Sequence, residues 1–448
     1  MSDLRASSED CTLPLFTGEA SRPIAWRDGR TVTLLEFGRH VAALASRLPA
    51  TGAMINLCGD RYKFIAAYAA ALSRGHAVLL PSARVEQVVC EIQEANHGSY
   101  RIDDASIDVA SMNAPAHDRA PRVAPEDIVM VGYTSGSTGR PQGHAKRWSS
   151  VNASTARNAA KIRDALASLA DQSLWLVATV PPQHMYGMES SILLPLLDRM
   201  AVHAGRPLFP ADVARALGEI PAPRVLISTP VHLRALVDSS QAFPQVTLVV
   251  SATAPLDQAL ARAVEAKLGA PLLEMFGSTE TCVIATRRTA IQARWQLYEG
   301  VSLQPSEEGT LVDAPWFTES VLLQDVIELH GQHEFVVRGR NADMIEVAGK
   351  RASLSDLTRR VLAIEGVKDA AVFQPDAAAS GSICRVAAFV VAPTLTAKQV
   401  VDALAASVDP AFLPRPLIFV DSLPRNDLGK LPRDKLVEML RKRIADGG

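Results

Sequence analysis

The chain has 448 residues, 48% of them hydrophobic, and its 46 basic and 48 acidic side chains leave a formal net charge of -2 at pH 7. This composition can build the cores of two or three domains, and its balanced charge argues against bulk nucleic-acid binding and a polybasic membrane-binding face. The 5 cysteines show no metal-ligand spacing, their odd number argues against a disulfide framework, and no long apolar run occurs, so we expect a protein of the reducing cytoplasm without a membrane span.

Short apolar segments of strand type alternate with helical patterns through most of the chain. Residues 34–48, after Thr33, show helical periodicity. The predicted strands are residues 53–58, 77–81, 127–133, 173–181, 223–230, 246–252 and 270–277. The predicted helices between several of them are residues 61–75, 210–220, 230–240 and 256–269. Continuous Val/Ile/Leu runs with intervening helices are typical of a parallel sheet buried on both faces, so we predict an α/β fold.

The pattern changes after about residue 290. Residues 297–314 and 333–340 have the character of short antiparallel strands, which predict a small β-barrel-like region. From Asp343 onward we predict a compact α+β pattern with a hairpin, a helix after the capping box at 353–356, two strands, another helix and a last strand. The expected domains are a large N-terminal domain, residues 1–340, and a small C-terminal domain, residues 341–448.

The stretch GYTSGSTGRPQG, residues 132–143, is small and polar and follows a predicted strand. Its glycines allow a ligand to approach the backbone, and its hydroxyls and successive N–H groups can cradle phosphate oxygens. It lacks the GxxxxGK[ST] pattern of a Walker A loop. Taken alone, it is equally consistent with a flexible polar surface loop.

Three further stretches complete a pattern. They are EMFGSTET (274–281), GRNADMIEVAGKR (339–351) and LPRNDLGKLPR (423–433). In this order and spacing, the four stretches resemble the signature motifs of the adenylate-forming superfamily, which includes acyl- and aryl-CoA synthetases, peptide-synthetase adenylation domains and luciferases. The resemblance covers roughly residues 30–440. A narrower similarity is to free-standing aryl-acid ligases that charge an acyl carrier protein in bacterial aryl-polyene pigment pathways.

The resemblance implies a reaction in two steps, with ATP and Mg²⁺ as cofactors. A carboxylate attacks the α-phosphate of ATP, giving an acyl adenylate and pyrophosphate, and a thiol then displaces AMP to give a thioester. The small C-terminal domain would rotate on the large one between the steps. We expect an aromatic or medium-length acid as substrate and, as acceptor in trans, an acyl carrier protein in preference to CoA.

The resemblance also implies which residues hold the nucleotide. The β- and γ-phosphates would be held by Thr134, Ser135, Gly136, Ser137, Thr138 and Gly139. Phe276 and Gly277 would lie beside the adenine, and Thr279 would bond the α-phosphate. Glu280 would bind Mg²⁺, a hard cation that prefers oxygen ligands; the alternative for Glu280 is a carboxylate at a helix N-terminus.

Four more residues match family positions further along the chain. Asp325 and Arg340 would contact the ribose, although Asp325 could be an ordinary strand-end residue and Arg340 part of a surface ion pair. His184 would begin the wall of the acid pocket, or else be structural. Lys430 would bridge the substrate carboxylate and the α-phosphate, rather than being a solvated lysine in a turn. The predicted pocket lining is Tyr186, Gly187, residues 251–254 and Met275.

Two departures from the family pattern keep other functions open. Gln142 stands where the family usually has lysine, for which Lys146 could substitute, and Ala342 stands at the usual hinge position. These changes leave open a slower or partner-dependent enzyme, and they motivate the rival hypothesis of a non-catalytic relative that binds nucleotide or a partner protein. The residues that argue against this rival are the retained Glu280, Arg340 and Lys430. An enzyme that stops at the acyl adenylate is a third possibility.

Overall fold

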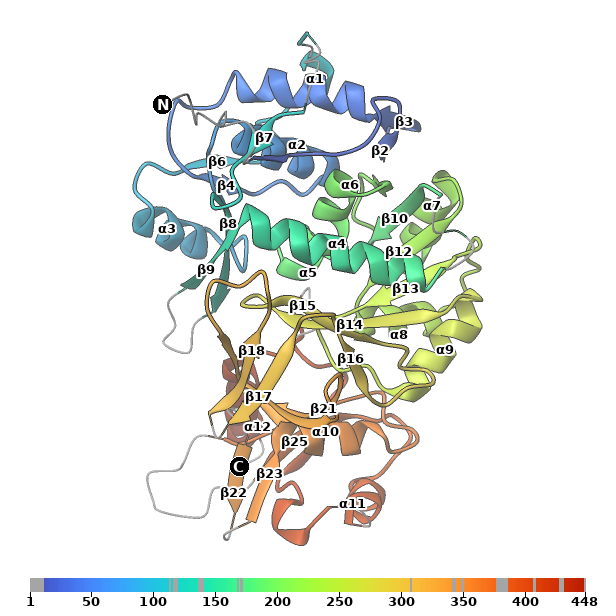
Figure 1. Cartoon of the computed structure of the whole chain (residues 1–448). Helices are drawn as coiled ribbons and strands as arrows, with labels where there is room; N and C mark the ends of the chain where they lie inside the picture. Colours follow the sequence, from blue (N-terminus) through green and yellow to red (C-terminus); the bar gives the residue numbers. More distant parts are fainter. Residues whose placement is uncertain are drawn as a thin grey trace. The chain divides into compact units, whose positions relative to one another are not determined.

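The computed structural model describes residues 12–112, 114–115, 120–135, 141–166, 169, 172–306, 308–340, 344–347, 350–375, 386–405, 408–426 and 431–446 (Figure 1). The chain forms two compact units. The first comprises Met1–Ala252, Gln258–Gln292 and Ala314–Thr318, and the second comprises Thr253–Asp257, Ala293–Asp313 and Glu319–Gly448. The sequence predicted a different kind of division, a C-terminal domain from residue 341 onward that rotates during the reaction. That boundary stays a prediction.

The first unit contains a five-stranded sheet that ends in a long hairpin. Its strand order is β6 (Tyr100–Ile102), β4 (Met54–Asn56), β5 (Val78–Leu80), β8 (Ile128–Ser135) and β9 (Pro141–Arg147). All neighbours are parallel except β8 and β9. Helices of this part are α1 (Leu34–Ala45), α2 (Arg61–Ser73), α3 (Glu86–Ala95) and α4 (Trp148–Asp164). The short strands β1 (Leu13–Pro14) and β7 (Arg122–Val123) pair separately.

A second sheet of the first unit carries most of the strands predicted to be parallel. Its order is β15 (Cys282–Arg287), β14 (Leu272–Ser278), β13 (Leu248–Ser251), β12 (Arg224–Ser228), β10 (Leu174–Ala178), β11 (Met200–His203), β2 (Pro23–Arg27) and β3 (Arg30–Thr33). The strands from β14 to β2 are parallel, and β15 and β3 pair antiparallel with their neighbours. The associated helices are α5 (Met185–Met188), α6 (Leu194–Leu197), α7 (Pro210–Glu219), α8 (Pro230–Asp238) and α9 (Gln258–Leu268).

These parallel strands confirm the predicted α/β class. Every residue of β10 and β13 is buried, as expected for strands covered on both faces. The stretch 132–143 differs from the expected single loop, because β8 continues to Ser135 and the chain returns as β9 at Pro141, with Thr134 opposite Gln142. Only cross-strand hydrogen bonding marks these polar residues as strands, since their side chains show no apolar alternation.

The second unit begins with antiparallel strands, as predicted. They are β16 (Trp295–Leu297), β17 (Ser302–Ser306), β18 (Gly309–Asp313), β19 (Val321–Leu323), β20 (Asp325–His330) and β21 (Glu334–Arg340). The order β17-β18-β19 forms one sheet, and β21 pairs with both β20 and β16. Trp295 stacks on Phe335 in the β16–β21 pair, with ring centroids 6.3 Å apart.

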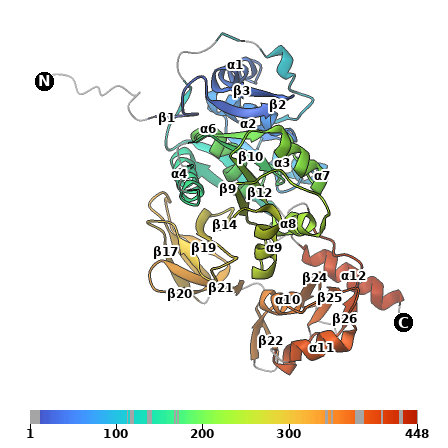
Figure 2. The ribbon, with the colours of Figure 1, turned by 90° about the vertical axis from the view of Figure 1, so that its right-hand side faces the viewer.

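The C-terminal part of the second unit has the predicted α+β pattern (Figure 2). Its elements are β22 (Met344–Val347), β23 (Lys350–Ser353), α10 (Leu354–Leu362), β24 (Asp369–Phe373), β25 (Ala387–Val391), α11 (Ala397–Ala405), β26 (Leu417–Phe419) and α12 (Arg433–Asp446). Ser353 caps α10 by accepting the Asp356 N–H, as the capping box predicts. Alternation along β24 divides the core: Ala370 and Val372 pack with residues of α10 and α11, whereas Ala371 and Phe373 pack with residues of α12. Within the described ranges no helix has the length and apolar character needed to cross a membrane.

Candidate active site

Two hairpins of the first unit bring predicted nucleotide-binding residues together. Residues 132–135 end β8, and the turn that contains Thr279 and Glu280 joins β14 to β15. A Cβ atom added at Gly132 would lie 2.9 Å from Thr279 Cγ2 and 3.4 Å from Met185 Cε. Glycine at this position therefore allows the hairpin, the turn and the start of α5 to pack closely.

Glu280 is the main charged group of this site. Its side chain is half-buried, and Oε1 lies 3.4 Å from His144 Nε2, which is 3.2 Å from Thr134 Oγ1. Burial raises the pKa of Glu280, but hydrogen bonding from Ser278 and the backbone and the charges of His144 and Lys146 outweigh burial, so its pKa lies below the ordinary value. Burial lowers the pKa of His144 despite the nearby carboxylate. At neutral pH the site therefore presents an ionised carboxylate.

Alternate residues of β9 lie on one face and become more buried toward the strand's end. Gln142 is exposed, His144 is half-buried and Lys146 is buried. The Lys146 ammonium donates to the backbone carbonyl of Glu280. Lys146 therefore holds the turn in this structure, whereas the sequence suggested it as a substitute phosphate-binding cation. The sequence does contain a signal for this strand, because polar residues alternate at Gln142, His144 and Lys146. That alternation predicts one shared strand face, which could have placed His144 near Glu280.

The turn itself is closed by its own hydroxyls. Thr281 Oγ1 accepts the N–H of Ser278, and Ser278 Oγ accepts the N–H groups of Glu280 and Thr281, at 3.1 to 3.2 Å. Glu280 therefore lies in a hairpin turn between two strands, and the alternative of a carboxylate at a helix N-terminus is wrong. Cys282 ends the turn with φ of +61°, which is uncommon for a residue with a side chain.

His184 lies at the start of a short buried helix, α5, whose first residue, Met185, contacts the position of Gly132. It is half-buried and precedes α5, which continues through the π-helical segment Glu189–Leu193 into α6. The Tyr186 hydroxyl donates to the Val250 carbonyl at 3.0 Å, next to the predicted pocket residues at the end of β13. At Gly187 a Cβ would lie 2.0 Å from the Pro181 carbonyl oxygen, so only glycine fits there.

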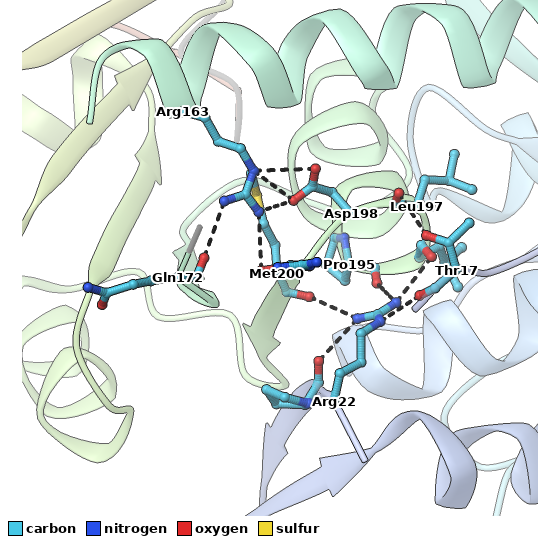
Figure 3. Close-up of polar contacts among 11 residues, drawn as sticks. Thr17, Arg22, Arg163, Gln172, Pro195, Leu197, Asp198 and Met200 are labelled. Atoms are coloured by element: carbon cyan, nitrogen blue, oxygen red, sulfur yellow. Dashed lines mark hydrogen bonds and ion pairs between the residues drawn. The ribbon is translucent and has the colours of Figure 1, made fainter. Parts of the chain in front are cut away.

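Two buried arginines hold this helix, Arg61 through Ser191 in its π-helical segment and Arg22 at its C-terminal end. The guanidinium of Arg61 donates to the carbonyls of Ala178 and Val180 and to Ser191 Oγ, at 2.5 to 2.9 Å. The guanidinium of Arg22 donates to the carbonyls of the α6 end and of its surroundings (Figure 3). These carbonyls belong to Thr17, Pro23, Pro195, Leu196 and Met200. The site is therefore supported by polar contacts that no apolar pattern in the sequence predicts.

The predicted ribose contacts lie in the second unit. Asp325, in β20, is buried and stands opposite Arg340, in β21, in the antiparallel register. The Asp325 carbonyl accepts the Thr310 hydroxyl at 2.8 Å. Strand pairing thus brings together two residues that are well separated in the sequence, while their role at a ribose stays a prediction.

Of the remaining predicted site residues, some lie within the part of the chain that the structure describes and others lie outside it. Phe276 is half-buried and Gly277 exposed, at the end of β14 next to the turn. Gly136, Ser137, Thr138, Gly139, Ala342 and Lys430 lie outside the described residues. Their roles in binding phosphate, in the hinge and in catalysis therefore stay predictions.

The side chains around Glu280 could hold a magnesium ion only together with the phosphates of a bound nucleotide. Among the described side chains no group of three or more His, Cys, Asp or Glu could hold a metal ion by itself. Glu280 offers one ionised carboxylate, and the Thr134 hydroxyl lies near the same His144 ring nitrogen as this carboxylate. Mg²⁺ usually takes one or two carboxylates, with substrate phosphates and water completing its shell, so this donor set fits magnesium.

Comparison with known proteins identifies the family of this chain. The model of the family described as "AMP-binding enzyme" matches residues 46–314, more than half of the chain. The chain belongs to this family. A 4-coumarate–CoA ligase of Halorhodospira halophila is 31% identical over 313 residues, which cover 66% of this chain and 73% of that ligase. The chain is an AMP-forming acid–thiol ligase, as the four motifs predicted.

Solved structures of this AMP-binding enzyme's fold include two complexes of related ligases. An anthranilate–CoA ligase with anthranoyl-AMP has a TM-score of 0.78 at 16% identity, and the match covers 98% of this chain and 100% of that one. The O-succinylbenzoate–CoA synthetase of Bacillus subtilis, with ATP and magnesium ion, has a TM-score of 0.77 at 17% identity, covering 93% and 96%. These likenesses concern the fold.

Proposed function

We propose that this AMP-binding enzyme uses MgATP to activate an aromatic carboxylic acid and passes the acyl group to a phosphopantetheine thiol. The observation that carries the proposal is that the Thr134 hydroxyl and the ionised Glu280 carboxylate both lie beside His144. Gly132, on the same hairpin as Thr134, packs against Thr279 and against Met185 of α5. Adenylation requires the carboxylate of the acid to lie next to the α-phosphate of ATP. A hairpin that would bind the phosphates, packed against the helix α5 that would line the acid pocket, meets this requirement.

In the first step, a carboxylate oxygen of the acid attacks the α-phosphorus, and the bond to the leaving pyrophosphate breaks. Thr279 would donate to the α-phosphate, and the stretch from Thr134 to Gly139 would bind the β- and γ-phosphates. Bound Mg²⁺, held by Glu280, would neutralise phosphate charge. Lys430 would stabilise the charge that develops between carboxylate and α-phosphate.

The nucleoside end would be held by other residues. Phe276 and Gly277, at the end of β14, would lie beside the adenine. Asp325 and Arg340 would bind the ribose hydroxyls, for which their pairing in the β20–β21 register is suitable. In the second step a thiolate would attack the acyl carbon, and AMP would leave with the bonding electrons.

An aromatic acid is the preferred substrate class. The named substrates of the relatives described above, 4-coumarate and anthranilate, are aromatic acids. The buried Tyr186 and the small, buried Ala252 line the predicted pocket and suit a planar ring, while a medium-length acid is the alternative.

The thiol acceptor is a phosphopantetheine arm, carried either by CoA or by a carrier protein. The relatives' names support CoA, whereas the similarity to carrier-protein ligases predicted from the sequence favours an acyl carrier protein. The sequence also left open an enzyme that stops at the acyl adenylate and a non-catalytic relative, and membership of the AMP-binding enzyme family together with the CoA-ligase relatives argues against both.

The test is acid-dependent exchange of labelled pyrophosphate into ATP across a panel of aromatic and medium-length acids, followed by mass spectrometry with CoA and with carrier proteins. We expect exchange to be strongest with aromatic acids, and thioester to form with one acceptor. Exchange without any thioester would identify an enzyme that stops at the adenylate. No exchange with any acid, in a protein that binds ATP, would favour the non-catalytic relative.

A further inference from the structure

Glu189 is a buried carboxylate that the proposed reaction does not use directly. It begins the π-helical segment Glu189–Leu193, and only 2% of it is exposed. Its Oε1 accepts hydrogen bonds from Ser154 Oγ at 2.7 Å, from Asn158 Nδ2 at 3.2 Å and from the backbone N–H of Val283 at 3.1 Å. A buried carboxylate is unfavourable unless its surroundings satisfy it, so this arrangement points to a specific requirement.

Two of these donors come from a single rigid element. Ser154 and Asn158 are one turn apart on α4, so this helix fixes the position of the carboxylate oxygen that they share. The third donor, Val283, directly follows Cys282 at the end of that turn. Glu189 thus connects a helix of the core to the backbone that presents Thr279 and Glu280.

The turn is held at a second point. The buried Lys146 donates to the Glu280 carbonyl, from the β8–β9 hairpin. Between these two contacts, Cys282 has φ of +61°, a conformation that persists only where the surroundings hold it. The backbone from residue 280 to residue 283 is therefore held by an acceptor on one side and a donor on the other.

We propose that Glu189 is a positioning residue for acyl-adenylate formation. By accepting the Val283 N–H from a place fixed by α4, it sets where Thr279 and Glu280 lie relative to the nucleotide. This inference rests on the proposed function. Its physical basis is that displacement of a binding group by about 1 Å reduces turnover roughly 100-fold.

Three variants distinguish positioning from packing. Glu189→Met keeps the length of the side chain but removes the acceptor, leaving the buried Val283 N–H unpaired, whereas Glu189→Gln keeps a carbonyl oxygen. Ser154→Ala is the matched control, because it removes a donor to the same carboxylate on the α4 side only. Each variant is measured for pyrophosphate exchange, with kcat and the KM for MgATP separated, for thermal stability, and for amide hydrogen exchange of the peptide covering residues 278–284.

We expect Glu189→Met to reduce kcat on the order of 100-fold and to raise the KM for MgATP. Glu189→Gln should stay within about fivefold of wild type, and Ser154→Ala within about threefold, since each keeps an acceptor for Val283. The Val283 amide should exchange faster in Glu189→Met than in Ser154→Ala.

Two results would overturn the proposal. One is a loss of turnover in Glu189→Met and Ser154→Ala that follows their loss of thermal stability, with no rescue by Glu189→Gln. The other is an unchanged exchange rate of the Val283 amide in Glu189→Met. The second measurement needs no catalysis, so it tests the Glu189 contact even if wild type exchanges pyrophosphate with no acid, the result that would instead reject the proposed function.

Discussion

At the scale of single residues, the site depends on side chains whose charge is set by their neighbours. Glu280 is half-buried, yet hydrogen bonding and the nearby His144 and Lys146 hold its pKa below the ordinary value. Glu189 is fully buried, and burial raises its pKa even though Ser154, Val283 and Asn158 donate to it. The first carboxylate faces the proposed magnesium, and the second faces the protein.

Changing Glu280 to Gln tests the role of its charge. Because Gln keeps the size but removes the negative charge, Glu280→Gln should reduce adenylation at limiting Mg²⁺ by on the order of tenfold or more. Part of the loss should be recovered by excess Mg²⁺. The measurement is pyrophosphate exchange over a magnesium titration, and equal activity of variant and wild type at all concentrations would make the carboxylate structural.

The raised pKa of Glu189 predicts a pH-dependent stability. Above its ordinary pKa of 4.5, the unfolded chain releases this proton while the folded chain retains it until the raised pKa is passed. The Glu189 contribution to the free energy of unfolding therefore falls as pH rises through that window. Compared with wild type, Glu189→Gln should gain relative stability as the pH rises above the ordinary pKa of 4.5, measured by denaturant unfolding. Parallel pH profiles for the two proteins would contradict this.

At the scale of elements, β9 differs most from the prediction, which treated residues 132–143 as a loop. It turns the predicted loop into a hairpin and places three polar residues on one face, from the exposed Gln142 to the buried Lys146. The Lys146 ammonium therefore binds the backbone of the turn, and in the proposed reaction other donors would bind the phosphates.

A pair of substitutions on β9 tests this division of roles. Gln142→Lys restores the family residue at an exposed position, so adenylation should be unchanged or raised by up to about tenfold through one added charge. Lys146→Met removes the donor to the Glu280 carbonyl, so adenylation should fall by about tenfold or more. MgATP kinetics of the two variants decide the matter, and complete loss of activity in Gln142→Lys would show that this hairpin binds nucleotide in another way.

At the scale of the whole molecule, the chain consists of two compact units, and the proposed reaction needs both. The first unit contains Thr134, Thr279 and Glu280, which we propose bind phosphate and magnesium, and the second contains Asp325, Arg340 and the C-terminal α+β region. If the small C-terminal domain rotates between the two steps, a different set of its residues can serve each step.

Lys430 gives the test of this idea. Lys430→Ala should reduce adenylation by roughly 100- to 1000-fold, because one preorganised charge-stabilising donor is removed. Thioester formation from supplied acyl adenylate should remain near wild type, since the rotated domain would present another face. Both half-reactions are measured on the folded variant, and an equal fall in both would contradict domain rotation.

Much of this protein could be predicted from its sequence because the deciding signals are local. Continuous apolar runs such as 246–252 indicate buried parallel strands, the capping box at Ser353 starts α10, and the four motifs identify the AMP-binding family. Each depends on residues that are close in the chain, or on spacing that the sequence shows directly.

The tertiary structure decided what depends on contacts between distant residues. Polar β9 has no apolar periodicity, so only pairing with β8 makes it a strand. The contact of Glu189 with Val283, and that of Lys146 with Glu280, join segments far apart in the sequence. A buried charge is determined by the donors and acceptors that folding brings to it, and no local pattern records which partners those will be.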